Sequence, residues 1–117
     1  APTVDYAAEL PLLEITPAFW RILRQFAPFG PGNRNPVFLA RGVRDAGFSR
    51  ILRGNHLRLS VRQGDSAVFS GIAFGQGGAY GKVATRRPFD ICFSLEEDRL
   101  RGDNWLQLVV KDLRFSE

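Results

Sequence analysis

The stretch GNHLRLSVRQG, residues 54–64, decides the fold class of this 117-residue chain. Its apolar residues Leu57, Leu59 and Val61 alternate with polar ones, and a period of two places successive side chains on opposite faces of a β-strand. Residues 63–65 (Gln-Gly-Asp) follow with the chemistry of a hairpin turn. The stretch therefore predicts a strand with one apolar face, one basic face and an adjoining hairpin.

The same period of two recurs along most of the chain. We expect strands at 37–44, 47–53, 56–63, 66–75, 88–98 and 104–115. Gly42 and Gly47 would allow the first two to form one long bent strand. Between the fourth and fifth strand segments, the glycine-rich residues 76–87 predict a mobile loop with at most a short turn of helix. Counted with the bent strand as one, the pattern predicts an all-β, five-stranded OB-fold Greek-key barrel.

A short N-terminal α-helix is predicted to precede this barrel. Residues 1–15 contain two prolines and no clean period, so they predict a linker, or tether. Residues 16–27 predict the helix, with Thr16 as its cap and Pro17 at its first position. An apolar stripe on it is expected to dock against a sheet: Phe19, Ile22, Leu23 and Phe26. The OB-fold domain would then occupy residues 28–117.

Positive charge is concentrated in one part of the sequence. The net charge is +4, but residues 20–62 carry nine arginines and a single acid, Asp45. Positive charges that are concentrated in this way repel one another, so the pattern is typical of a protein that binds an anionic partner. No stretch approaches the roughly 18 apolar residues that span a membrane. The single cysteine, Cys92, fits a reducing compartment, so we expect a cytoplasmic protein that does not contact membranes.

The residues that could carry chemistry do not assemble into an active site. One histidine and one cysteine leave metal and Cys-His sites without a second partner. The acids at 96–98 would point to alternating faces of a strand rather than converge on an ion. The glycine-rich residues 75–81 match neither the dinucleotide nor the phosphate-loop motif. We therefore expect no enzymatic activity and no cofactor in this chain.

What remains is a surface for single-stranded nucleic acid, in which a basic groove follows the phosphates and aromatic side chains stack on bases. The basic candidates are Arg41, Arg44, Arg50, Arg53, His56, Arg58, Arg62 and Lys82. The aromatic candidates are Phe74, Tyr80 and Trp105. Tyr80 is favoured because it falls in the predicted loop, whereas Trp20 is expected in the core.

Four blocks resemble, in order and spacing, the C-terminal OB domain of the RecJ single-strand-specific DNA exonuclease. They are APFGPGNRNPVFLARGV (27–43), GNHLRLSVRQG (54–64), SGIAFGQG (70–77) and FDICFSLEEDRLRGDNWLQLVVKDLRF (89–115). The resemblance covers roughly residues 10–117. Two departures are the basic Arg34, where the family commonly has an acid in this loop, and the richness in glycine of residues 76–87.

The resemblance implies that this chain is a fragment of a 5′→3′ exonuclease acting in DNA repair and recombination. The catalytic site, with Mn²⁺ or Mg²⁺, would lie in other domains, and this barrel would grip single-stranded DNA. The implied partners are the remainder of the nuclease chain and the single-stranded DNA-binding protein, and we expect a monomer. The alternative is an OB module that braces the nuclease or docks a partner protein. Such a surface should be apolar or mixed in charge, unlike residues 20–62.

Overall fold

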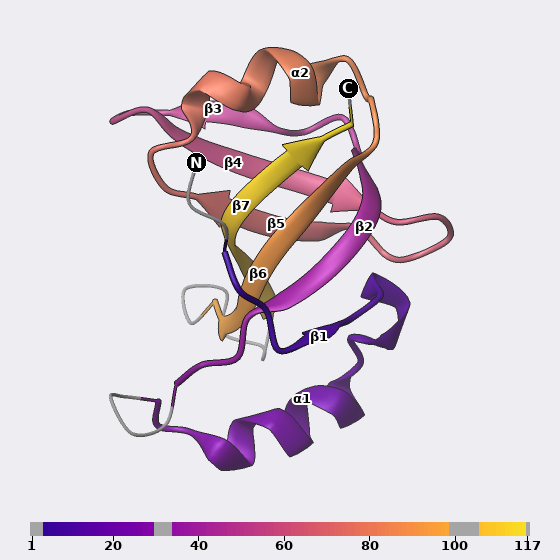
Figure 1. The fold of residues 1–117 in the computed structure, drawn as a ribbon, viewed down its shortest axis with the longest axis vertical. Helices are drawn as coiled ribbons and strands as arrows, with labels where there is room; N and C mark the ends of the chain where they lie inside the picture. The colour runs from indigo at the N-terminus through magenta and orange to yellow at the C-terminus, as the bar shows by residue number, and fades with distance from the viewer. Residues whose placement is uncertain (1–3, 30–33, 99–105, 117) are drawn as a thin grey trace.

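Strands wrap around a single apolar core in the computed structural model, which describes residues 4–29, 34–98 and 106–116 (Figure 1). The strands are β1 (Ala8–Glu9), β2 (Phe38–Asp45), β3 (Arg50–Leu52), β4 (His56–Arg62), β5 (Phe69–Ala73), β6 (Phe89–Glu97) and β7 (Leu106–Phe115). The α-helices are α1 (Pro17–Leu23) and α2 (Tyr80–Ala84). Short 3₁₀ helices are η1 (Leu12–Glu14), η2 (Arg24–Phe26) and η3 (Gly77–Ala79).

Five strands close into a barrel, namely β2, β6, β7, β5 and β4, while β3 continues β2 beyond its bend and β1 is added beside β2. The sheet order is β1-β2-β6-β7-β5-β4-β3, and an additional pairing between β2 and β4 closes it. All neighbours are antiparallel except β1–β2 and β5–β7, which are parallel. The predicted all-β OB-fold barrel is confirmed.

The long bent strand was also predicted correctly. Gly42 has a φ of +67° and lies in a bulge between Ala40 and Val43, while Gly47 has a φ of +104° at the bend itself. At the bend the backbone N–H of Ala46 still donates to the carbonyl of Ser60, at 2.7 Å. The chain can therefore pair first with β6 and then with β4 without ending the sheet.

Alternation along the strands selects the core as expected. Leu57, Leu59 and Val61 of β4 are fully buried, and Phe93 of β6 is too. The side chains between them on β4 face outward, so the inside of the barrel is apolar and the outside of β4 is basic. This division positions the candidate site.

The prediction of a linker over residues 1–15 was wrong for the part that the structure describes. β1 pairs with β2, and Leu10, Leu12 and Ile15 are buried in the core. The backbone N–H of Leu12 donates to Gln63 Oε1 at 2.8 Å. Because this segment combines a two-residue strand with a 3₁₀ turn, it has no period long enough to recognise in the sequence.

The helix begins as predicted, but it buries a different face. Thr16 Oγ1 accepts from the N–H of Phe19 at 3.1 Å, which caps the first turn. Trp20 and Leu23 are buried, whereas Ile22 and Phe26 are 62% and 60% exposed. The helix is oriented by Trp20, whose indole Nε1 donates to Glu97 on β6 at 3.0 Å.

The prediction of a mobile loop with at most a short turn of helix was wrong for residues 77–84, because η3 and α2 follow each other directly there. Val83 on α2 is fully buried and fixes the segment over the barrel, and Tyr80 packs against the same core. The choice of Tyr80 as a base-stacking residue assumed a mobile loop, and this packing removes that reason.

Candidate nucleic-acid interface

The outer face of β4 presents a line of polar side chains. His56, Arg58, Ser60 and Arg62 occupy the positions between the buried Leu57, Leu59 and Val61. In a strand these positions share one face. The outward side of β4 thus carries three basic or titratable residues within a single strand.

Register places a second arginine beside each arginine of β4. Arg50 of β3 is the cross-strand partner of Arg58, and Arg44 of β2 is the partner of Arg62. We call these four residues the arginine face. The two pairs are four residues apart on β4, which is about 13 Å at ~3.3 Å per residue. Like charges directly opposite each other destabilise a sheet, so this arrangement favours an anionic ligand.

The positive charges of the arginine face are not neutralised by carboxylates of the described residues. Among residues 4–29, 34–98 and 106–116, none of its four guanidinium groups has a carboxylate within ion-pair distance. Arg58 is half-buried, and its Nε is covered and has no hydrogen-bond partner in the described part of the chain. Contacts with a ligand would therefore use the terminal guanidinium nitrogens of Arg58.

Arg41 does not belong to this surface, although the sequence grouped it there. Its Nε lies 3.1 Å from Glu9 Oε1, and its Nη1 lies 3.8 Å from Asp90 Oδ2. The hydrogen bond and the charge of Glu9 raise the pKa of Arg41. The outer side of β2, β6 and β7 is therefore mixed in charge, because Arg114 is also paired, with Asp112 at 2.8 Å.

Two exposed aromatic side chains accompany the arginine face. Phe74, at the end of β5, is 62% exposed, and its ring lies edge-to-face on His56 with centroids 5.3 Å apart. His56 Nδ1 also accepts from the N–H of Gly75 at 2.9 Å, so the imidazole fixes the backbone next to Phe74. Phe74 and His56 are therefore neighbours on one surface.

Phe48 is the aromatic residue that the sequence analysis missed. It is 75% exposed in the bend between β2 and β3, where Ser49 Oγ accepts from the N–H of Ser60 at 3.0 Å. This contact places the bend that carries Phe48 opposite Ser60, in the middle of β4. The position of Phe48 two residues before Arg50 was a signal, since a strand period of two would give both the same face.

The other predicted residues lie elsewhere. Arg53 is exposed in the turn between β3 and β4, at the His56 end of the arginine face. Lys82 is on α2, with Nζ 5.8 Å from the centre of the Phe115 ring. Trp105 lies outside the described residues.

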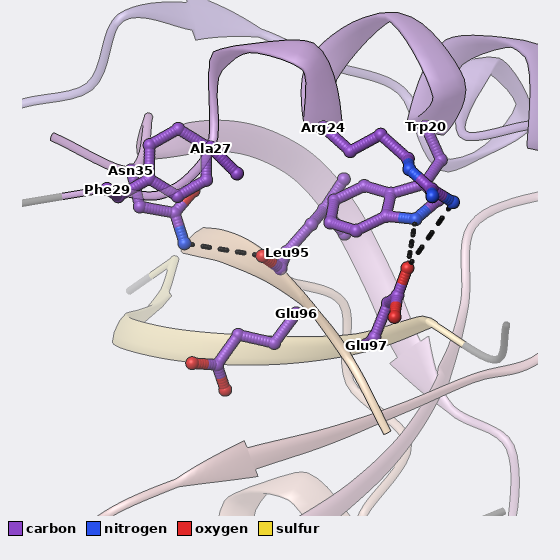
Figure 2. Close-up of a pocket in the computed structure, with 8 residues that line it drawn as sticks. All are labelled: Trp20, Arg24, Ala27, Phe29, Asn35, Leu95, Glu96 and Glu97. Carbon is purple, nitrogen blue, oxygen red and sulfur yellow. Dashed lines mark hydrogen bonds and ion pairs between the residues drawn. The ribbon is translucent and has the colours of Figure 1, made fainter. Parts of the chain in front are cut away.

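A separate pocket of about 530 Å³ lies between α1 and the end of β6 (Figure 2). Glu97 accepts from Trp20 Nε1 there and lies 3.7 Å from Arg24 Nη1. Asn35 Nδ2 donates to the carbonyl of Leu95 at 3.3 Å. With Glu96 and Glu97 on its wall, the pocket does not suit phosphate, and these contacts attach the helix to the barrel.

The described residues do not supply a metal-binding set. No group of three or more His, Cys, Asp or Glu side chains within them is placed to hold an ion. No helix among these residues is both long enough and apolar enough to cross a membrane.

Comparison with known proteins agrees with the barrel described above. The family described as "RecJ OB domain" matches residues 6–112. A structure of RecJ from Thermus thermophilus in complex with Mn²⁺ is 27% identical, with a TM-score of 0.67 over 97% of this chain. A structure of the same protein with Mg²⁺ is also 27% identical, with a TM-score of 0.65 over 94%. A search of curated proteins found no match.

The chain corresponds to only part of these structures. It spans 16% of the length of each of the two RecJ chains. The activity of those longer chains therefore cannot be assigned directly to this chain.

Proposed function

This chain belongs to the RecJ OB domain family, and from that premise we propose that it grips single-stranded DNA on the arginine face for a RecJ-like nuclease. One observation carries the proposal. Two pairs of arginines face each other across neighbouring strands, Arg50 with Arg58 and Arg44 with Arg62, and none of the four forms an ion pair with a carboxylate among the described residues. OB folds bind oligonucleotides on the face of the second and third strands, which here are β4 and β5. Arg58 and Arg62 lie on β4 itself, and Arg50 and Arg44 are their cross-strand partners.

The physical basis is a combination of phosphate binding and base stacking. Arginine binds phosphate through two parallel hydrogen bonds, and the two pairs could hold backbone phosphates at two points along β4. The exposed rings of Phe48 and Phe74 are available for stacking, which contributes about 1–3 kcal/mol per base. Stacking tolerates any base, so the proposed grip is independent of sequence.

The activity and partners of the longer protein form part of the same proposal. The parent would be a 5′→3′ exonuclease acting in repair and recombination in the cytoplasm. The described residues do not fit a catalytic Mn²⁺ or Mg²⁺, so cleavage would be performed by other domains. The remainder of the nuclease chain and the single-stranded DNA-binding protein would be partners, with the chain itself a monomer.

A role in bracing the nuclease is the second candidate. It is favoured by Leu13 and Ile22, which are 63% and 62% exposed on the N-terminal segment and α1. This surface would contact the remainder of the nuclease chain. The two roles are compatible, because these residues are not part of the arginine face.

Fluorescence anisotropy with labelled oligothymidylate tests the grip. For the unaltered chain we expect log affinity to fall with log salt concentration, with a slope of about −0.7 per phosphate contacted. The double variant Arg50→Ala/Arg62→Ala removes one arginine from each pair, so binding should weaken and the slope should become shallower by roughly 1.4.

The matched control is Arg41→Ala/Arg114→Ala. It removes the same two charges from arginines that are paired with Glu9 and Asp112, and it should retain the slope of the unaltered chain. If the two double variants weaken binding equally, only net charge matters and the arginine face is not the site. If the unaltered chain does not bind at low salt, the bracing role remains and the grip is wrong.

A further inference from the structure

A second basic surface lies around the C-terminal end of α2. We call Lys82, Arg86 and Arg87 the α2 patch. Figure 1 shows the end of α2 and the end of β7 at the same end of the barrel as the upper end of β2. None of the three cations forms an ion pair with the described residues.

The α2 patch adjoins the arginine face directly. Arg44 Nη1 donates to the backbone carbonyl of Arg86 at 3.4 Å. The Arg86 guanidinium lies against the bend between β2 and β3, because a Cβ placed on Gly47 would be 3.0 Å from Arg86 Nη2. Arg44 therefore contacts the patch while its cross-strand partner, Arg62, continues the arginine face along β4.

The other two cations are held together on one ring. Lys82 Nζ and the guanidinium carbon of Arg87 lie 5.8 Å and 5.4 Å from the centre of the Phe115 ring. Arg87 Nη2 also donates to the carbonyl of Ser116 at 2.7 Å. These contacts order the cations without neutralising them, so both charges stay available to an anion.

Arg86 occupies a backbone conformation that suits glycine better. Its φ is +64°, in the left-handed region that costs energy for any residue with a Cβ. Arg86 directly follows Thr85, the C-cap residue of α2, and a left-handed residue at this position is a common way for a helix to end. Cations do favour helix C-termini, but a helix of only five residues has a weak dipole, which leaves three unpaired cations largely unexplained.

We propose that the α2 patch is a second phosphate-binding site, which takes the nucleotides of the same single strand beyond Arg44 and Arg62. The strand would follow β4 to Arg44 and Arg62, pass Arg86 and continue over Lys82 and Arg87. This inference rests on the proposed grip and extends it, because it sets the direction in which the bound strand leaves the barrel.

The test compares two lengths of labelled oligothymidylate, of about 5 and about 15 nucleotides, which lie near the two ends of the range of roughly 4 to 16 nucleotides that an OB fold covers. The variant is Arg86→Gly. Glycine adopts a positive φ freely, so the free energy of unfolding should stay the same or rise. Any loss of binding would then not be due to a damaged fold.

We expect Arg86→Gly to weaken binding of the longer oligomer roughly two- to fivefold, as for a single exposed ion pair, and to make its salt slope shallower by about 0.7. Binding of the shorter oligomer should not change. The control Arg21→Ala removes one positive charge from the exposed surface of α1 and should leave both oligomers unaffected.

Two results would overturn the inference while leaving the grip intact. One is unchanged binding of the longer oligomer by Arg86→Gly. The other is an equal loss for both lengths, which would make Arg86 a support for the arginine face rather than a separate site. Failure of the unaltered chain to bind either oligomer would instead overturn the proposed grip, and this inference with it.

Discussion

Arg41 and Arg58 show how the role of a side chain depends on what faces it. Both are strand residues in the basic part of the sequence, and both were predicted to bind nucleic acid. Arg41 meets Glu9 and Asp90 across the sheet, whereas Arg58 meets another arginine, Arg50. Only the second environment leaves positive charge available to a ligand.

At the scale of the single residue, Cys92 leads to a prediction of how the stability of the chain depends on pH. Burial raises the pKa of its thiol above the ordinary value of 9.0. The folded chain therefore holds the thiol proton more tightly than the unfolded chain. The stability due to the neutral thiol is complete below the ordinary pKa, and it is lost as pH rises from there through the folded pKa.

We expect the free energy of unfolding, measured by urea titration at a series of pH values, to decline above about pH 9. In Cys92→Ala this decline should be less steep, because no thiol ionises on unfolding. If the two proteins show parallel curves between about pH 8 and pH 10, the buried thiol does not contribute.

At the scale of elements, the N-terminal segment behaves as part of the barrel. β1 extends the sheet beside β2, and Gln63 clamps the segment by accepting from Leu12 N–H and donating to the carbonyl of Arg41 at 2.6 Å. α1 is attached separately, through Trp20 and Glu97.

The neighbouring residues Leu12 and Leu13 test this attachment. Leu12 is 1% exposed in the core, and Leu13 is 63% exposed. Leu12→Ala should lower the free energy of unfolding by about 2–5 kcal/mol, while Leu13→Ala should stay within about 0.5 kcal/mol. Urea titration of both variants measures this, and equal effects would mean that the segment is a tether after all.

At the scale of the whole molecule, the barrel depends on two pairings between segments far apart in the chain, β2–β6 and β5–β7. The second brings Gly71 beside Leu108, and a Cβ on Gly71 would lie 3.2 Å from the carbonyl oxygen of Leu108. Closure therefore depends on a position without a side chain.

Gly71→Ala should lower the free energy of unfolding by about 1–3 kcal/mol, because the added methyl group is too large for the space between β5 and β7. The matched change Gly81→Ala places the same group on α2, where a Cβ meets nothing within 4 Å, and should stabilise by about 0.4–1 kcal/mol. Thermal unfolding of the two variants should therefore shift in opposite directions. Shifts in the same direction would contradict this account of the packing between β5 and β7.

The sequence alone determined the barrel, the alternation of β4 and the clustering of arginines, because strand period and charge are properties of neighbouring residues. The cross-strand pairing of Arg50 with Arg58, the neutralisation of Arg41 and the exposure of Phe48 were decided only by tertiary structure. Each depends on register or on a bend, which bring together segments that no local pattern relates. The basic strand 56–62 could be predicted from the sequence, but the sequence could not show which arginines lack a carboxylate partner.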